Sequence, residues 1–167
     1  SEELGEGDGL VSGPLEGVRV LGLTHAWAGP YCGMMLGDMG AEVLKIESPR
    51  QEKEARGGYP YVGGESVIFM MLHRNKKSVT LDLKQKAGKD IFFDLARTSD
   101  ILIQNFRPGT MAKLGLTYEA LKQINPALIY ASLSGYGNTG PKADYPGVNM
   151  IALAASGLAS TTRSEEH

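Results

Sequence analysis

The sequence has little cysteine, no excess of one charge and no long apolar run. Cys32 is its single cysteine, so no disulfide forms within the chain, as expected for the cytoplasm or, alternatively, the mitochondrial matrix. A formal net charge of -2 gives no general attraction to nucleic acid or to an anionic membrane. No run approaches the roughly 20 apolar residues that span a bilayer. We therefore expect a soluble protein without nucleic-acid or membrane partners, in which any anion site is local.

The length of 167 residues allows one domain with a sizeable core. Residues 1–13 are acidic and rich in glycine, so we expect a disordered or added tail there, and residues 161–167 form a second polar tail. The apolar run before the second tail has no terminating element, which indicates a domain that is cut short. The expected domain comprises residues 14–160 and is incomplete.

Strand-like and helix-like segments alternate within this domain. Runs of β-branched and aliphatic residues predict five strands, at residues 18–24, 41–47, 77–83, 100–105 and 127–133. Apolar residues at helical spacing predict helices at residues 30–40, 87–99 and 117–126, with Thr117 as the N-cap of the last. Residues 48–64 are expected to form a long surface loop. The pattern predicts an α/β, Rossmann-like fold, in which a mainly parallel sheet has helices on both faces and binds ligands at the carboxyl ends of its strands.

A glycine-rich segment follows the fifth strand and contains Gly135, Gly137 and Gly140 at the spacing of a dinucleotide-binding fingerprint. That fingerprint belongs to the first strand of its unit and leads directly into a helix. Here, Pro141 and polar residues interrupt any immediate helix, and the acidic residues at the right distance fall in the closing tail. The spacing therefore does not predict an NAD site, and turns with positive φ are the simpler explanation for the glycines.

Five segments of the chain resemble, in order and at consistent spacing, the N-terminal part of family III CoA-transferases, the formyl-CoA transferase and carnitine CoA-transferase family. They are PLEGVRVLGLTHAWAGPYCGMMLGDMGAEVLKIESP (14–49), RNKKSVTLDLK (74–84), DILIQNFRPGTMAKLGL (100–116), NPALIYASLSGYGNTGP (125–141) and ALAASGL (152–158). The sequences of these segments are most similar to those of succinyl-CoA:dicarboxylate CoA-transferases. The resemblance implies the CoA-binding part of an enzyme that moves CoA between an acyl-CoA and a carboxylic acid. It also implies an interlocked homodimer and neither a metal nor NAD.

CoA carries a diphosphate and a 3'-phosphate, so its site needs basic side chains, free backbone N–H groups and an apolar surface for adenine. Basic residues flank two of the predicted strands: Arg74, Lys76 and Lys77 near one, and Arg107 and Lys113 after another. Phe106 adjoins Arg107 and is placed to stack on a base. For each cation taken singly, solvation of a loop end is the alternative; taken together with the resemblance, the cations favour a CoA site.

The resemblance assigns CoA-binding roles to particular positions of this sequence. The assigned positions are His25, Trp27 and Ala28 after the first strand, Leu81 and Lys84 in a nucleotide-contacting strand, Asn105, Phe106 and Arg107, Lys113, and the stretch from Tyr145 to Val148. Gly135, Gly137 and Gly140 would let the backbone approach the thioester. His25 is also a candidate supporting catalytic residue, with a buried core histidine as the alternative.

The sequence departs from the family pattern at several positions. The family usually has Asp at Gly22, Arg at Ser48 and Glu at Gln104. Val148 replaces a His that racemase relatives use for proton transfer, which disfavours acyl-CoA racemase activity. The family's nucleophilic aspartate is expected beyond residue 167, so the resemblance implies no catalytic nucleophile in this chain. The alternative function is a noncatalytic CoA-binding or interaction module whose sheet a partner completes.

Overall fold

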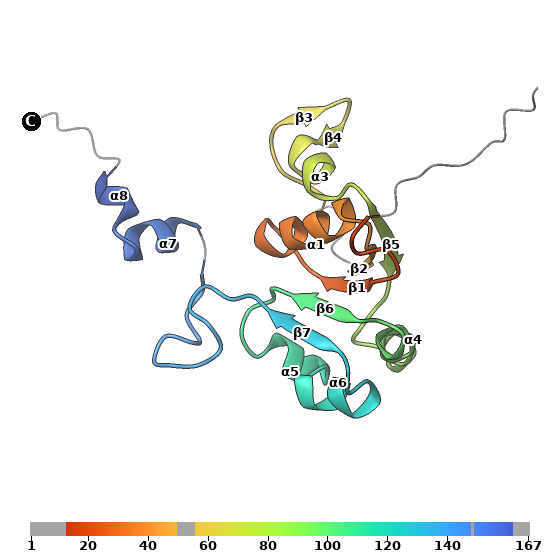
Figure 1. Cartoon of the computed structure of the whole chain (residues 1–167). Coiled ribbons are helices and arrows are strands. Elements are labelled where there is room, and N and C mark those ends of the chain that lie inside the picture. The colour runs from red at the N-terminus through yellow and green to blue at the C-terminus, as the bar shows by residue number, and fades with distance from the viewer. Residues whose placement is uncertain (1–12, 50–55, 148, 162–167) are drawn as a thin grey trace, which may run out of the picture.

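The computed structural model describes residues 13–49, 56–147 and 149–161. Five strands form one sheet in the order β5-β2-β1-β6-β7, and every neighbouring pair is parallel (Figure 1). The strands are β1 (Arg19–Leu23), β2 (Glu42–Glu47), β5 (Lys76–Thr80), β6 (Ile101–Gln104) and β7 (Ile129–Ser132). The chain proceeds from β1 through β2 to β5 on one side and from β6 to β7 on the other. The strand order therefore reverses between β1 and β6, which is where sheets of this kind bind ligands.

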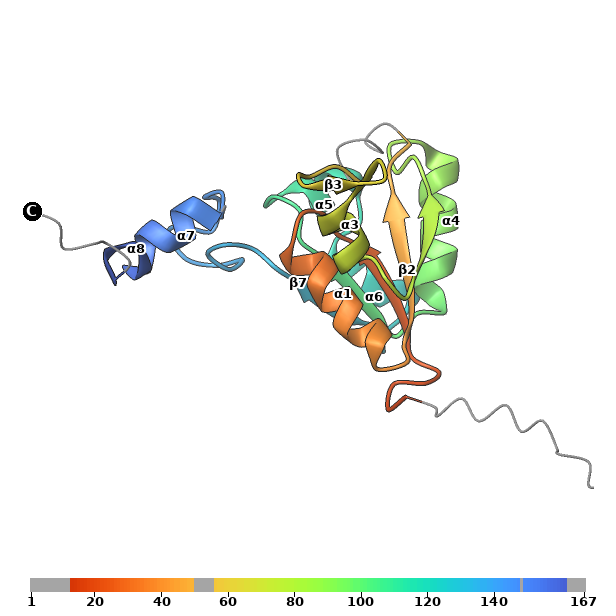
Figure 2. The ribbon, with the colours of Figure 1, turned by 90° about the horizontal axis from the view of Figure 1, so that it is seen from above.

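Helices cover both faces of the sheet, as predicted. α1 (Ala28–Asp38) and α3 (Val67–Leu72) lie on one face, and α4 (Lys86–Arg97), α5 (Thr110–Leu114) and α6 (Tyr118–Ile124) lie on the other (Figures 1 and 2). Because side chains alternate along a strand, Val20 joins the core beneath α1 while Leu21 and Leu23 join the core beneath α4 to α6. The second core is the larger and contains the fully buried Phe92 of α4 and Leu121 of α6.

Local signals explain where the predicted helices begin. The Thr117 hydroxyl accepts a hydrogen bond from the Ala120 N–H at 3.3 Å, which confirms the predicted N-cap of α6. α1 begins at Ala28, two residues before Pro30, its predicted start. Pro30 is tolerated there because the N–H groups of the first helical turn have no partner within the helix.

Two predictions about the middle of the chain were wrong. β5 ends at Thr80, so Leu81 and Lys84 follow the strand instead of lying in it. The expected loop of residues 48–64 contains β3 (Tyr61–Val62), which pairs with β4 (Glu65–Ser66) across a Gly63-Gly64 turn. α3 follows directly, because the Ser66 hydroxyl accepts a hydrogen bond from the Phe69 N–H at 3.2 Å and caps it. Strands of two residues and a helix of six leave too little periodicity to be predicted.

The last elements of the described chain are α7 (Asn149–Ala155) and α8 (Leu158–Thr161), which lie in the apolar run before the second polar tail. They contact each other and stand apart from the sheet in both views (Figures 1 and 2). In the described ranges, the helices are too short or too polar to cross a membrane.

Candidate functional site

The loops after β1 and β6 meet at the carboxyl edge of the sheet, where the strand order reverses. The Asn105 carboxamide joins them through two reciprocal hydrogen bonds with the backbone of His25. Its Oδ1 accepts from the His25 N–H at 2.9 Å, and its Nδ2 donates to the His25 carbonyl oxygen at 2.8 Å. The next residue, Ala26, has a φ of 56°, which is uncommon for a residue with a side chain. Asn105 therefore holds this turn in its shape.

The amino end of α1 packs closely against the same carboxamide. A Cβ atom on Gly29 would lie 2.8 Å from Asn105 Oδ1 and 2.7 Å from Thr24 Cγ2, so only glycine fits this position without a shift. Among the residues that the structure describes, no side chain caps the helix, and its first turn contains no acidic residue. The N–H groups at the start of α1 are thus available to an anion at the sheet edge.

His25 is exposed, so the alternative of a core histidine is wrong. Its ring stacks on Phe106, with ring centroids 5.5 Å apart and an interplanar angle of 21°. One face of the Phe106 ring is therefore occupied by His25. Partial burial of the imidazole and the nearby Arg107 guanidinium both lower the pKa of His25 below its ordinary value of 6.5, which disfavours the protonated ring.

Replacing Arg107 by glutamine is expected to raise the pKa of His25 toward 6.5, because it removes a positive charge that opposes protonation of the imidazole. An NMR titration of the imidazole protons, assigned with His25→Gln, measures this pKa. Arg97→Gln, at the far end of α4, is the matched control and should leave it unchanged. An unchanged pKa in Arg107→Gln would show that the guanidinium does not act on His25.

Three exposed cations follow the carboxyl ends of β5 and β6: Lys84, Arg107 and Lys113. None of the three pairs with an acidic side chain in the described ranges. Lys113 lies in α5, the helix that directly follows the Phe106–Arg107 loop. The structure thus places Lys84, Asn105, Phe106, Arg107 and Lys113 at the same edge of the sheet as His25.

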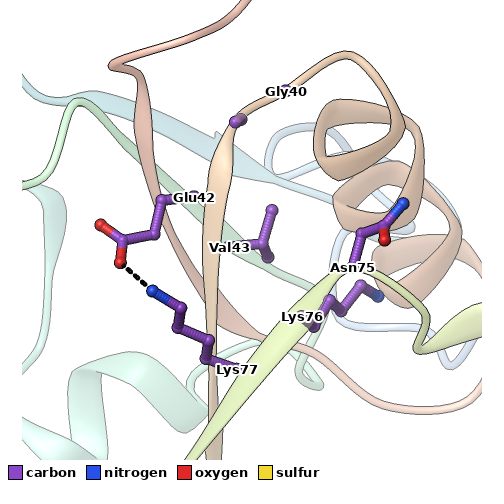
Figure 3. A pocket seen from close by; sticks show the side chains of 7 residues that line it. Gly40, Glu42, Val43, Asn75, Lys76 and Lys77 are labelled. Atoms are coloured by element: carbon purple, nitrogen blue, oxygen red, sulfur yellow. Dashed lines mark hydrogen bonds and ion pairs between the residues drawn. The ribbon is translucent and has the colours of Figure 1, made fainter. Parts of the chain in front are cut away.

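Arg74 and Lys77 do not lie with this group. Because β5 is parallel to β2 and begins at Lys76, both residues are at the amino edge of the sheet, opposite the carboxyl edge. Arg74 pairs with Asp38 at 2.5 Å. Lys77 pairs with Glu42 at 2.7 Å, as Figure 3 shows. The prediction that they share one site with Asn105 and Lys113 was wrong about their placement, since residues before a parallel strand and residues after one lie at opposite edges.

The amino edge has a shallow pocket of its own, with a volume of about 430 Å³. Its lining residues are Gly40, Ala41, Glu42, Val43, Asn75, Lys76 and Lys77 (Figure 3). The Lys76 ammonium is directed to the carbonyl oxygens of Pro30 at 2.6 Å and Leu72 at 2.7 Å. It therefore holds α1 and α3 together, and its burial lowers the pKa of Lys76 to about 8.

A larger groove, with a volume of about 990 Å³, runs along β7 between the Phe106–Arg107 loop and α6. Tyr118 and Tyr130 line it in an edge-to-face arrangement, with ring centroids 5.9 Å apart. Its lining includes Ser132, the last residue of β7, and Asn138 of the glycine-rich segment. The groove thus combines aromatic and polar lining residues, and Arg107 is one of them.

The glycine-rich segment folds back on itself beside this groove. A Cβ atom on Gly135 would lie 2.2 Å from the Cα atom of Gly147, so the two ends of the loop touch only because both are glycine. Gly137 and Gly140 have positive φ values of 80° and 93°, in agreement with the turn explanation. Tyr145 is exposed and meets Tyr136 edge to face at 6.2 Å. Val148 lies outside the described residues.

A buried charged network that was not predicted from the sequence lies at the carboxyl end of β2. Lys45 and Glu47 are both nearly inaccessible, and the Lys45 ammonium donates to Glu47 Oε1 at 2.8 Å. Arg56 donates to Glu47 Oε2 at 2.7 Å, and the Ser78 hydroxyl also donates to this carboxylate. Burial alone would raise the pKa of Glu47, but these bonds lower it from 4.5 to about 2. The signal was the spacing of the two charges at i and i+2, which puts both on one face of the strand.

Comparison with known proteins gives a consistent result. The model of CoA-transferase family III matches residues 15–167. The chain is 45% identical over 150 residues to the acetyl-CoA:oxalate CoA-transferase of Acetobacter aceti, covering 90% of this chain and 39% of that protein. It is 43% identical over 153 residues to the human succinyl-CoA:glutarate CoA-transferase, covering 91% of this chain and 35% of the relative.

A solved structure has the same fold. A CAIB/BAIF family protein from Brucella suis superimposes with a TM-score of 0.86 at 36% sequence identity, covering 93% of this chain and 42% of that one. The chain therefore spans well under half the length of the relatives that it matches.

Proposed function

The chain belongs to CoA-transferase family III, and from this premise we propose that the carboxyl edge of its sheet binds the nucleotide and pantetheine of a CoA thioester. In the complete enzyme, CoA then passes between an acyl-CoA and a carboxylic acid. One observation carries the proposal: in the described chain, the start of α1 without a side-chain cap and the Asn105–His25 turn lie where the strand order reverses, and Arg107 and Lys113, which have no acidic partner there, follow β6 at the same point.

The proposed roles follow from chemistry and position. Arg107, Lys113 and Lys84 take the phosphates, because each is exposed and has no carboxylate to compete with a phosphate in the described chain. The turn at His25, Trp27 and Ala28 takes the pantetheine and thiol end, next to the free N–H groups of α1. The groove beside Tyr118 and Tyr130 offers an aromatic surface to the adenine ring. Gly135, Gly137, Tyr145 and Val148 are proposed to close over the tail of the ligand.

We assign this chain the binding and orientation of the thioester. The imidazole of His25 lies in the turn proposed to take the thiol end, and because its pKa is lowered we assign it the role of a hydrogen-bonding group. The resemblance assigns the carboxylate nucleophile to no residue of this chain, and Asp144, beside the glycine-rich segment, is exposed in a turn. Since the relatives are named for oxalate and glutarate, a small dicarboxylic acid is the proposed acceptor class, in a homodimeric enzyme.

Charge-neutralising variants test which edge binds CoA. Arg107→Gln and Lys113→Gln are each expected to weaken CoA binding about 10-fold, because each removes one charged hydrogen bond to a phosphate. Arg74→Gln and Lys77→Gln, at the amino edge, are the matched controls and should bind CoA as the wild-type chain does. Calorimetric titration measures all four dissociation constants. A loss confined to the amino-edge variants would place the site at the opposite end of the sheet.

A further inference from the structure

Gln104 ends β6 directly beneath the proposed site. The side chain is buried, with 7% of its surface exposed, and both ends of its amide have partners. Its Oε1 accepts from the Phe106 N–H at 3.0 Å, and its Nε2 donates to Ser132 Oγ at 2.5 Å. Ser132 ends the neighbouring strand, β7. One buried amide therefore joins the loop after β6 to the start of the glycine-rich segment.

The direction of these bonds is set by chemistry. A backbone N–H only donates, so the amide oxygen of Gln104 faces Phe106 and its NH₂ group faces Ser132. The Ser132 hydroxyl accepts from Gln104 and is left to donate its own proton. It donates to Asn138 Oδ1, at 3.3 Å. The bonds thus run in one direction, from Gln104 through Ser132 to Asn138 in the glycine-rich loop.

We propose that Gln104 is a positioning residue that holds both halves of the CoA site in register. Through the Phe106 N–H it fixes the loop that carries Phe106 and Arg107, and through Ser132 and Asn138 it fixes residues 134–147 over the groove. This inference rests on the proposed function, in which Arg107 binds a phosphate and the glycine-rich segment closes over the tail of the ligand. Gln104 itself is too buried to touch the ligand, so it acts only through these partners.

Two variants distinguish the effects of the two hydrogen bonds of the Gln104 amide in the ligand-free chain. Gln104→Met keeps the side-chain length and removes both hydrogen bonds, to Phe106 and to Ser132. Ser132→Ala removes only the hydrogen bond that leads to the glycine-rich loop. In Gln104→Met we expect the Phe106 amide to exchange its hydrogen about 10-fold faster, and the backbone order parameters of residues 134–147 to fall. In Ser132→Ala we expect the loop to loosen while Phe106 keeps its wild-type protection. Ser132→Thr retains the hydroxyl and should restore the loop.

The control is Gln123→Met on the exposed surface of α6, which should change neither readout. CoA affinity is expected to fall about 10-fold in Gln104→Met and about 3-fold in Ser132→Ala.

The inference is overturned if the Phe106 amide exchanges at the wild-type rate in Gln104→Met, or if it exchanges as fast in Ser132→Ala as in Gln104→Met. If Gln104→Met does not fold, Ser132→Ala and Ser132→Thr still decide whether the loop depends on this hydroxyl. Absence of CoA binding by the wild-type chain would remove the proposed function, while the exchange pattern would still decide the role of Gln104.

Discussion

Replacing Asn105 by alanine is expected to weaken CoA binding about 30-fold. The substitution removes both hydrogen bonds that hold the backbone of His25, each contributing about 1 kcal/mol, and 2 kcal/mol corresponds to about 30-fold in affinity. Without them, Ala26 is no longer held at its positive φ, and the turn relaxes away from the start of α1. Calorimetric titration of the folded variant with CoA measures the loss.

A second amide, at the amino edge, provides the control. Asn75 donates to Asp38 at 2.8 Å and has a φ of 57°, so Asn75→Gly removes its amide while tolerating its backbone conformation. This variant should bind CoA with wild-type affinity. If Asn105→Ala bound CoA as tightly as Asn75→Gly, the His25 turn would not be part of the site.

Glu47→Gln is expected to lower the free energy of unfolding by about 3 kcal/mol. The substitution leaves the Lys45 ammonium buried without a carboxylate, and breaking one partner of a buried pair costs about 3 to 5 kcal/mol. Urea denaturation measures the change. Glu65→Gln, at an exposed position of β4, should change the stability by no more than about 0.5 kcal/mol. Equal stability of the two variants would mean that the network of Lys45, Glu47 and Arg56 does not support the sheet.

The same carboxylate predicts a dependence of stability on pH. The folded-state pKa of Glu47 is about 2, below the value of 4.5 for an unperturbed glutamate, so the folded state favours the ionised form. Its contribution is fully present above pH 4.5 and is lost as the pH falls toward 2. Glu47→Gln should therefore show a shallower loss of stability than the wild-type chain over this interval.

Most of the sheet could be predicted from the sequence, because four of its five strands lie in largely apolar runs that alternate with segments of helical periodicity. β1, β2, β6 and β7 fall within the predicted segments, and α4 and α6 lie where Phe92 and Leu121 recur at helical spacing. The position of the site was also predictable in outline. Residues that follow parallel strands converge at one edge, which brings His25 and Asn105 together across 80 positions of sequence.

The sequence could not reveal how individual polar groups are used. Arg74 and Lys77 were grouped with Arg107 on charge alone, but β5 begins between them, at Lys76, and puts them at the opposite edge. The Asn105 carboxamide was assigned to the ligand, whereas in the free chain it bonds to the backbone of His25. Such pairings depend on long-range contacts that no local pattern records.

Titration of CoA into the purified chain by calorimetry, at low and at physiological ionic strength and with NADH as the comparison ligand, tests the CoA site most directly. We expect CoA binding that weakens as salt is added, because phosphates meet cations at an exposed sheet edge, and no binding of NADH. NADH binding, or CoA binding that does not respond to salt or to Arg107→Gln, would contradict a phosphate site at the carboxyl edge.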